Sequence, residues 1–225
     1  MPFQVLPNWV QFGAFMLAIN AGMINVLGLI SLLHQSVSHM TGNVSLLAIA
    51  LIDHDYRAVL FLILIIISYV LGSSFSGYIL GNSHFKLGRR YGIPLSLVTL
   101  FIVLCWLFIP YYPRYALLWA CCAMGVQNAM VSHYRGAIIR TTHLSGVLTD
   151  LGLSLGYWFK GLHTENKKVI LHALIFFGFI IGSIVAAFSY PYLQLAAFLV
   201  PAFLSLFLTL VYWYIYFRHS YFQKS

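Results

Sequence analysis

The chain has 225 residues, of which 61% are hydrophobic and 7% are charged, and its mean hydropathy is +0.90. So few charged side chains cannot form a water-soluble surface around a core, which excludes an ordinary soluble domain. The formal net charge of +8 would suit nucleic acid, but no arginine and aromatic motif typical of such a site accompanies it. We therefore expect a lipid bilayer as a partner and no nucleic acid.

Six apolar segments are candidate membrane spans. Four reach the roughly 20 residues that a hydrocarbon core of about 30 Å requires of a helix: 10–33, 58–80, 169–190 and 195–217. The other two, 93–109 and 116–131, are shorter but uncharged. The first segment follows no Lys or Arg and is too long for the apolar core of a signal peptide, so we expect a retained span.

Two shorter apolar pieces, 44–52 and 147–159, follow polar motifs in the two halves of the chain. Ten helical residues cover about 15 Å, roughly half of the hydrocarbon core. If both pieces crossed, there would be eight spans and the basic residues would divide seven to five, which is almost no bias. We therefore predict that both are re-entrant or interfacial half-helices.

With six spans the basic residues divide ten to two. One side has Lys86, Arg89, Arg90, Arg135, Arg140, Lys160, Lys167, Lys168, Arg218 and Lys224, and the other has Arg57 and Arg114. Lysine and arginine accumulate in cytoplasmic loops. This bias predicts that both termini are in the cytoplasm.

The second half of the chain repeats the first. Gly22-Met23-Ile24-Asn25 and Ser38-His39-Met40-Thr41-Gly42-Asn43 return as Gly125-Val126-Gln127-Asn128 and Thr142-His143-Leu144-Ser145-Gly146-Val147, at offsets of 103 and 104. Three spans per half invert the second repeat relative to the first. We predict an all-α polytopic membrane protein with six transmembrane helices in two inverted repeats, 1–112 and 113–225, which together form one membrane domain.

Small residues recur at every fourth position of the second and fifth spans. They are Ser68, Gly72 and Ser76 in the second span, with Ser73, Gly77 and Gly81 beside them, and Gly178, Gly182 and Ala186 in the fifth. This spacing lets helix backbones approach closely in a membrane. The two ridges either pack inside the chain or form the seam of a homodimer, and the sequence leaves both open.

The polar motifs form the candidate site. Thr, Ser and Asn are preferred at helix N-caps, so we expect Thr41-Gly42-Asn43 to open the first half-helix and Ser145-Gly146 the second. A helix N-terminus carries about half a positive charge and free N–H groups, which bind anions. The predicted solute contacts are His39, Thr41, Gly42, Asn43, Asn25, Asn128, Thr142, His143, Ser145, Gly146 and Arg140.

Several of these residues have a structural alternative. Asn25 and Asn128 could simply join neighbouring helices by hydrogen bonds worth about 1 kcal/mol each. His39 and His143 could converge on a metal, but one histidine per half is too few for a closed site. No Cys or carboxylate stands at ligand spacing beside them, so we expect neither a metal nor a cofactor.

The charged candidates have alternatives as well. Arg140 is either a cytoplasmic anchor or an attractor of anions at an aqueous vestibule. Asp150 lies in the second half-helix, where an ionisable residue is a functional hypothesis by default, and its expected partner is Arg140. The four carboxylates place no pair inside one predicted span, so we expect a protein that is not an enzyme, with an intramembrane enzyme as a remote alternative.

This combination of motifs resembles the YoaK-like family of bacterial integral membrane proteins, domain of unknown function 1275. The resemblance rests on Gly22-Met23-Ile24-Asn25, His39-Met40-Thr41-Gly42-Asn43, Met124-Gly125-Val126-Gln127-Asn128-Ala129, Thr141-Thr142 and Ser145-Gly146. It covers nearly the whole chain and implies a multi-pass protein of the cytoplasmic (inner) membrane of a bacterium, but no activity. Asn25 stands where the family often has Asp, and Ser145 with Val147 replaces a Thr and an Asn. Because Asn cannot titrate, His39 and His143 are the titratable candidates beside the motifs.

The sequence therefore predicts a small secondary transporter or facilitator. A small polar solute, with anionic character favoured, would bind where the two half-helix N-termini meet. The alternative is a membrane protein that does not transport, such as a lipid-binding or assembly factor. A solvent-connected cavity between the halves would favour transport, and a dry, packed axis would favour the alternative.

Overall fold

A computed structural model of the chain describes residues 8–81, 89–132, 141–162, 164 and 166–222. The regular elements in these residues are all helices. In chain order they are α1 (Asn8–Ser31), α2 (Met40–Ile52), α3 (Tyr56–Leu80), α4 (Arg89–Phe108), α5 (Pro113–Ser132), α6 (Leu144–Phe159), α7 (Asn166–Leu193), the short 3₁₀ helix η2 (Gln194–Phe198) and α8 (Leu199–Phe222). All six apolar segments predicted to span are helical, with ends displaced by a few residues.

Local sequence signals account for several helix ends. Asp55 caps α3, because its carboxylate accepts hydrogen bonds from the backbone N–H groups of Arg57 and Ala58 at 3.2 and 3.1 Å. Gly81 ends the same helix with a φ of 55°, a value that glycine adopts without steric conflict. Pro113 is the first residue of α5, where its missing N–H is not needed.

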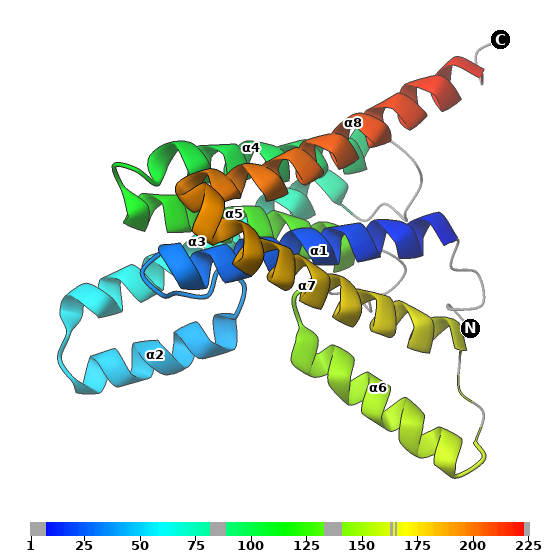
Figure 1. The fold of residues 1–225 in the computed structure, drawn as a ribbon, viewed down its shortest axis with the longest axis horizontal. Helices are drawn as coiled ribbons and strands as arrows, with labels where there is room; N and C mark the ends of the chain where they lie inside the picture. The colour runs from blue at the N-terminus through cyan, green and yellow to red at the C-terminus, as the bar shows by residue number, and fades with distance from the viewer. Residues whose placement is uncertain (1–7, 82–88, 133–140, 163, 165, 223–225) are drawn as a thin grey trace.

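Five continuous helical stretches in the described residues are long and apolar enough to cross a membrane. The last of them, Asn166–Arg218, has 53 residues and turns back on itself. Pro191 lies near the end of α7, and Gln194 has a φ of 52° where η2 begins. After this break α8 runs in the opposite direction to α7 (Figure 1). The stretch thus contains two long helices.

The long helices lie along one common axis and alternate in direction from α1 to α8 (Figure 1). Close neighbours are α1 with α7, α3 with α5, α4 with α5, and α4 with α8. The short helix α2 lies against α3, and α6 lies against α7. The start of α1 and the end of α8 are at the same end of the bundle, on the right of Figure 1, and the turn between α2 and α3 is at the other end.

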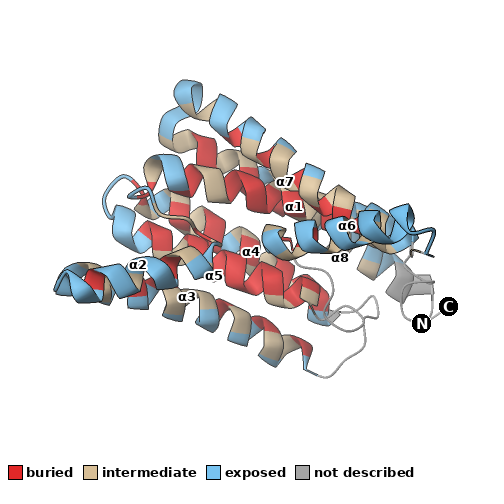
Figure 2. Cartoon of the chain, turned by 90° about the horizontal axis from the view of Figure 1, so that it is seen from below, coloured by how far each residue is buried: buried red, intermediate tan, exposed pale blue. Residues whose placement is uncertain are grey.

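Burial places α5 at the centre of the bundle. In its apolar window 72% of residues are buried, against 17% for α3, and Figure 2 shows continuous burial along α5 with exposed residues on α2 and α6. The two short helices therefore lie at the periphery of the single chain.

Glycines bring α1 and α7 into backbone contact. A Cβ atom added to Gly22 would meet the carbonyl oxygen of Phe179, and one added to Gly182 would meet the carbonyl oxygen of Ile19. In a membrane such close approach provides the van der Waals contact that holds helices together.

The helices α3 and α5 touch in the same way. A Cβ atom on Gly125 would meet the carbonyl oxygen of Tyr69, and one on Gly72 would meet that of Cys122. These four residues are the counterparts, at offsets of 103 and 110 in the sequence, of the four that join α1 to α7. Residues that the duplication pairs therefore make equivalent contacts in the two halves.

The small-residue ridges pack inside the chain, as the first of the two alternatives predicted. Gly72, Ser76, Gly178, Gly182 and Ala186 are all buried. The ridge beside the first is different, because a Cβ on Gly77 or Gly81 would have no neighbour within 4 Å. The homodimer remains a prediction, and a small-residue seam would have to use this second ridge.

Candidate functional site

A polar cavity of about 650 Å³ lies between the N-terminal ends of α2 and α6. Viewed from below, the two short helices lie in front of the long ones and extend to opposite sides (Figure 2). The cavity is lined by Asn25, Leu29, Ser36, Ser38, His39, Met40, Thr41, Tyr69, Ser73, Asn128, Ala129, Ser132, Thr142, His143, Leu144, Ser145 and Phe179. Both halves of the chain thus contribute to one site.

Seven of the predicted solute contacts line this cavity: Asn25, His39, Thr41, Asn128, Thr142, His143 and Ser145. Gly42, Asn43 and Gly146 lie close to it in the chain but do not line it. Arg140 lies outside the described residues.

The two half-helices begin earlier than predicted, at Met40 and Leu144. Their N-caps are His39 and His143, and neither imidazole makes a capping hydrogen bond. The first helical hydrogen bonds run from the N–H groups of Asn43 and Val147 to the carbonyls of these histidines, at 3.2 and 3.1 Å. The preceding N–H groups in each first turn have no carbonyl partner inside the helix, so both ends retain their capacity to bind an acceptor.

Thr41 and Ser145 are not the caps but the second residues of their helices, with exposed side chains that line the cavity. The glycine that follows each of them lies against the histidine that caps its helix. A Cβ on Gly42 or Gly146 would meet the imidazole ring of the N-cap histidine of the same helix. The glycines therefore let each histidine ring fold over the first turn.

Asn25 holds the segment that connects α1 to α2. Its side-chain oxygen accepts hydrogen bonds from the hydroxyls of Ser36 and Ser38 at 2.7 and 3.1 Å and from the N–H of Ser38 at 3.3 Å. The amide of Asn43 donates to the carbonyl of Ser36 at 3.2 Å. Asn25 thus braces the polar motif and also faces the cavity.

Asn128 does the same for the segment before α6. Its amide nitrogen donates to the hydroxyls of Tyr69 and Thr142 at 2.8 and 2.6 Å, and its oxygen accepts from the hydroxyl of Thr141 at 3.1 Å. Asn128 thus joins α5 to α3 through Tyr69, as the structural alternative predicted, whereas the hydrogen bonds of Asn25 go to the segment that connects α1 to α2. Both roles are compatible with a place in the cavity wall.

A further buried pair, Asn20 and Gln127, was not among the predicted contacts. Asn20 donates to the side-chain oxygen of Gln127 at 3.0 Å, and Gln127 donates to the carbonyl of Leu17 and the hydroxyl of Thr141 at 2.9 and 3.1 Å. The bonds to Asn20 and Leu17 join α5 to α1. Gln127 stood within a quoted motif, but nothing in the sequence pointed to its partner on another helix.

The described cavity lining carries no Asp, Glu, Lys or Arg. Its titratable side chains are those of His39, His143 and Tyr69. In the part of the chain that the structure describes, no three His, Cys, Asp or Glu residues converge as a metal site. Hydroxyls, amides and helix N-termini therefore dominate the polar surface of the cavity.

Asn25 provides a direct test of how the first motif is held. Replacing it with Asp should leave folding intact, because all three of its hydrogen bonds are accepted by the oxygen that Asp retains. Replacing it with Leu leaves those donors unpaired and should lower stability by about 2 kcal/mol. Thermal unfolding of the purified variants measures both effects, and equal melting temperatures for the two would contradict the bracing role.

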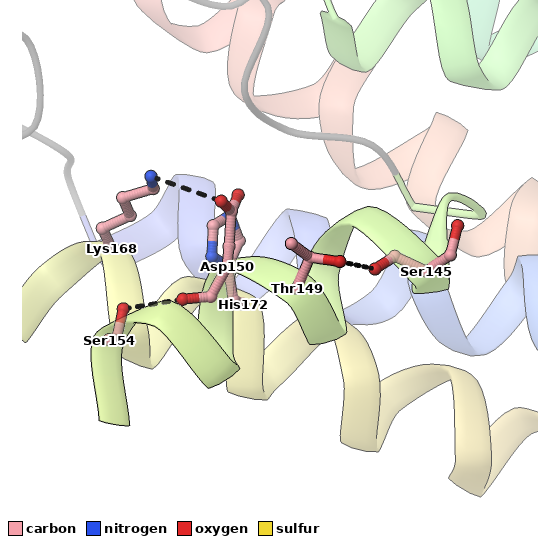
Figure 3. Close-up of polar contacts among 6 residues, drawn as sticks. All are labelled: Ser145, Thr149, Asp150, Ser154, Lys168 and His172. Atoms are coloured by element: carbon pink, nitrogen blue, oxygen red, sulfur yellow. Dashed lines mark hydrogen bonds and ion pairs between the residues drawn. The ribbon is translucent and has the colours of Figure 1, made fainter. Parts of the chain in front are cut away.

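Asp150 lies on α6, outside the cavity. Its expected partner Arg140 is not among the described residues. The partners that the structure gives are Lys168, at 3.8 Å from Nζ to Oδ1, and His172, at 3.6 Å from Nε2 to Oδ2 (Figure 3). Asp150 therefore joins the half-helix to α7.

The helices and the cavity define a multi-pass α-helical membrane protein. A family model described as "Protein of unknown function (DUF1275)" matches residues 13–211, and the chain belongs to this family. It is similar to the UPF0700 transmembrane protein YoaK of Bacillus subtilis (strain 168), with 25% identity over 186 residues, covering 78% of this chain and 82% of that protein. No solved structure matches the chain significantly.

Proposed function

We propose that the protein is a small transporter or facilitator of a small polar solute, with anionic character favoured. The observation that carries this proposal is the cavity of about 650 Å³, into which two half-helices direct their N-termini. A cavity of that size accommodates a small molecule. Free N–H groups at both ends and the hydroxyls around them favour a solute that accepts hydrogen bonds.

The arrangement of the helices supports a pathway through the chain. In the proposed topology α1, α3, α4, α5, α7 and α8 span the membrane, and α2 and α6 enter from opposite sides to about its middle. Because helix directions alternate (Figure 1), the second set of three spans is inverted relative to the first. Inverted repeats with discontinuous helices at their interface are typical of transporters whose binding site lies near the membrane midplane.

The absence of fixed negative charge in the described lining supports an anionic or strongly polar solute, since no carboxylate there would repel it. No carboxylate pair in the described lining offers acid and base catalysis either, so the proposed role is binding and transport.

The proposed topology predicts where tags will be found. A tag inserted in residues 53–55, between α2 and α3, should be periplasmic, and a reporter fused after Ser225 should be cytoplasmic, because lysine and arginine favour the cytoplasmic side. Protease accessibility in intact cells and spheroplasts distinguishes the two sides. A cytoplasmic tag at 53–55 would mean that α2 crosses the membrane, and the inverted arrangement would then be wrong.

The proposed function is tested by a solute-binding screen on the purified protein in detergent or nanodiscs. A solute that binds only the folded state stabilises it by about 2.7 kcal/mol at 100 times its Kd, so the melting temperature should rise with the logarithm of concentration. Small carboxylates, phosphate, sulfate and polyols form a suitable panel. A panel without any concentration-dependent shift would count against a solute site in the cavity.

A lipid-binding role is the second candidate, and one observation favours it. An apolar cavity of about 410 Å³ lies between α1, α4, α5 and α8. Its lining includes Trp9, Tyr91, Met130, Phe207 and Tyr212, which suit an acyl chain. A stoichiometric lipid retained through delipidation would support this candidate, provided that the solute screen is negative.

A further inference from the structure

A cluster of three ionisable side chains lies where α6 packs against α7 (Figure 3). Asp150 on α6 is placed between Lys168 and His172, which are one turn apart on α7, at distances of 3.8 and 3.6 Å. Ionisable side chains within the helices of a membrane protein are energetically costly and usually have a function. Neither the cavity nor its bracing hydrogen bonds involve this cluster.

His172 is the unusual member of the cluster. The residue is 1% exposed, and its Nδ1 atom has no hydrogen-bond partner. The Nε2 atom thus faces the Asp150 carboxylate, while the Nδ1 atom forms no hydrogen bond. Leaving a buried polar atom unpaired is destabilising, and an apolar side chain at this position would avoid that cost.

The equivalent positions in the first half of the chain carry no ionisable side chains. At the offsets of 104 and 110 that relate the half-helices and the neighbouring spans, the equivalent positions are Leu46, Ala58 and Leu62. The half-helix α2 nevertheless lies against α3 as α6 lies against α7. Attaching a half-helix to its neighbouring span therefore does not require charge, and the cluster needs another explanation.

We propose that His172 and Asp150 form a proton-binding site. The imidazole takes up one proton from water, no other bond forms or breaks, and the product is an imidazolium facing the Asp150 carboxylate. Histidine is the side chain whose unperturbed charge change falls between about pH 5 and 8, and the nearby carboxylate stabilises its charged form.

Among the described residues, two charged side chains act on His172: those of Asp150 and Lys168. Its helix α7 packs against α6, which contributes Asp150, and against α1, which has no titratable side chain anywhere along its length. Burial opposes protonation of the imidazole, the Asp150 carboxylate favours it, and the charge of Lys168 on the same helix opposes it. One attractive and one repulsive group thus act on the bound proton.

The proton site is connected to the cavity through α6. Asp150 lies five positions after Ser145 in the cavity wall, a rise of about 7.5 Å along one helix. Protonation of His172 strengthens its electrostatic attraction to Asp150. Because Asp150 and Ser145 lie on the same half-helix, a shift of Asp150 toward α7 also moves the N-terminus of α6. The consequence for a solute rests on the proposed function, whereas the proton site does not.

The site is tested by NMR of the full-length protein with ¹³C-labelled histidine, using His172→Gln to assign the resonance. We expect the His172 signal to titrate between about pH 4.5 and 8.5. Carboxylate and ammonium act with opposite sign on an imidazole, so Asp150→Asn and Lys168→Gln should move the midpoint in opposite directions, each by about half a pH unit or more. Ser154→Ala, which removes only a hydroxyl bonded to the carbonyl of Asp150, is the matched control.

A His172 signal that does not titrate, or midpoints that stay unchanged in both charge variants, would overturn the proposal. Lys168→Gln alters a partly exposed side chain, so the test remains decisive if Asp150→Asn does not fold. No solute is needed, so a negative solute screen leaves this result standing, and a failed titration leaves the cavity proposal standing.

The link to the half-helix is measured separately with spin labels at Leu153→Cys on α6 and Tyr78→Cys on α3, both exposed positions. We expect the distance distribution to depend on pH, and His172→Gln to remove that dependence. A dependence that survives in His172→Gln but is lost in the His39→Gln/His143→Gln double variant would place the proton at the cavity and overturn the inference.

Discussion

Replacing Gly182 with leucine is expected to abolish accumulation of folded protein in the membrane. A Cβ atom at this position would meet the backbone of Ile19 on α1, and a backbone atom cannot move aside as a side chain does. Separating α1 from α7 removes the close contact on which helix association in lipid depends. Overpacking a core by a few methylenes costs about 1–3 kcal/mol or more, and here the whole helix pair must shift. Gly72→Leu should have the same effect through Cys122 on α5.

Gly77→Leu is the matched control for this experiment. Gly77 lies on the same helix as Gly72, but a Cβ there would have no neighbour within 4 Å. We expect wild-type yield and melting temperature for Gly77→Leu, measured by size-exclusion chromatography and thermal unfolding. A loss as large as that of Gly72→Leu would show that added bulk anywhere on α3, and not the close approach to Cys122, causes the effect. It would also be the result expected if the second ridge forms the homodimer seam.

Ser145→Leu is expected to weaken solute binding at least tenfold while leaving the fold intact. Ser145 is exposed, lies in the first turn of α6 and lines the cavity. A leucine there fills space next to the free N–H groups and replaces a hydroxyl by a group that cannot hydrogen-bond. Because a tenfold loss corresponds to about 1.4 kcal/mol, one blocked contact is sufficient.

Thr149→Leu separates this effect from a general loss of α6. Thr149 lies one turn further along the same exposed face and outside the cavity lining, and its hydroxyl bonds only within the helix. Its variant should bind solute with unchanged affinity in the same melting-temperature assay. Equal losses in the two variants would indicate that α6 as a whole, and not the cavity wall, controls binding.

The polar motifs combine two tasks that sequence reasoning treated as alternatives. Asn25 and Asn128 each hold the irregular segment before a half-helix, and each also lines the cavity. Backbone outside a helix is tolerated at membrane depth only where protein or a water-filled cavity surrounds it. Holding such a segment and forming a polar site are therefore one requirement.

The starts of the half-helices illustrate where local signals were insufficient. Cap preference favoured Thr41 and Ser145, but the helices begin at Met40 and Leu144. The N–H of His39 is already bound by the hydroxyl of Ser36 at 3.1 Å, and Ser36 is held in turn by Asn25. In α2, hydrogen bonds of the segment before the helix thus fix the backbone of the N-cap residue, and intrinsic cap preference did not predict the first helical residue.

The sequence by itself determined the membrane class, the apolar segments, the two short helices and the duplication. These follow from composition, from the length of apolar runs relative to the bilayer and from the spacing of motifs, all of which are local properties. It also indicated seven residues that line the cavity, because caps, glycines and histidines recur at matching positions in both halves.

Only the tertiary structure decided which helices touch. The small residues of α3 and α7 predict close approach, but a ridge of glycines does not specify the partner, and each ridge packs on the other half of the chain, α3 on α5 and α7 on α1. In the sequence, His172 is one polar residue within an apolar segment. It becomes a candidate proton site only because folding buries it beside Asp150. Pairing between distant segments depends on the fold as a whole, since the free energy of a buried polar group is set by its neighbours in space.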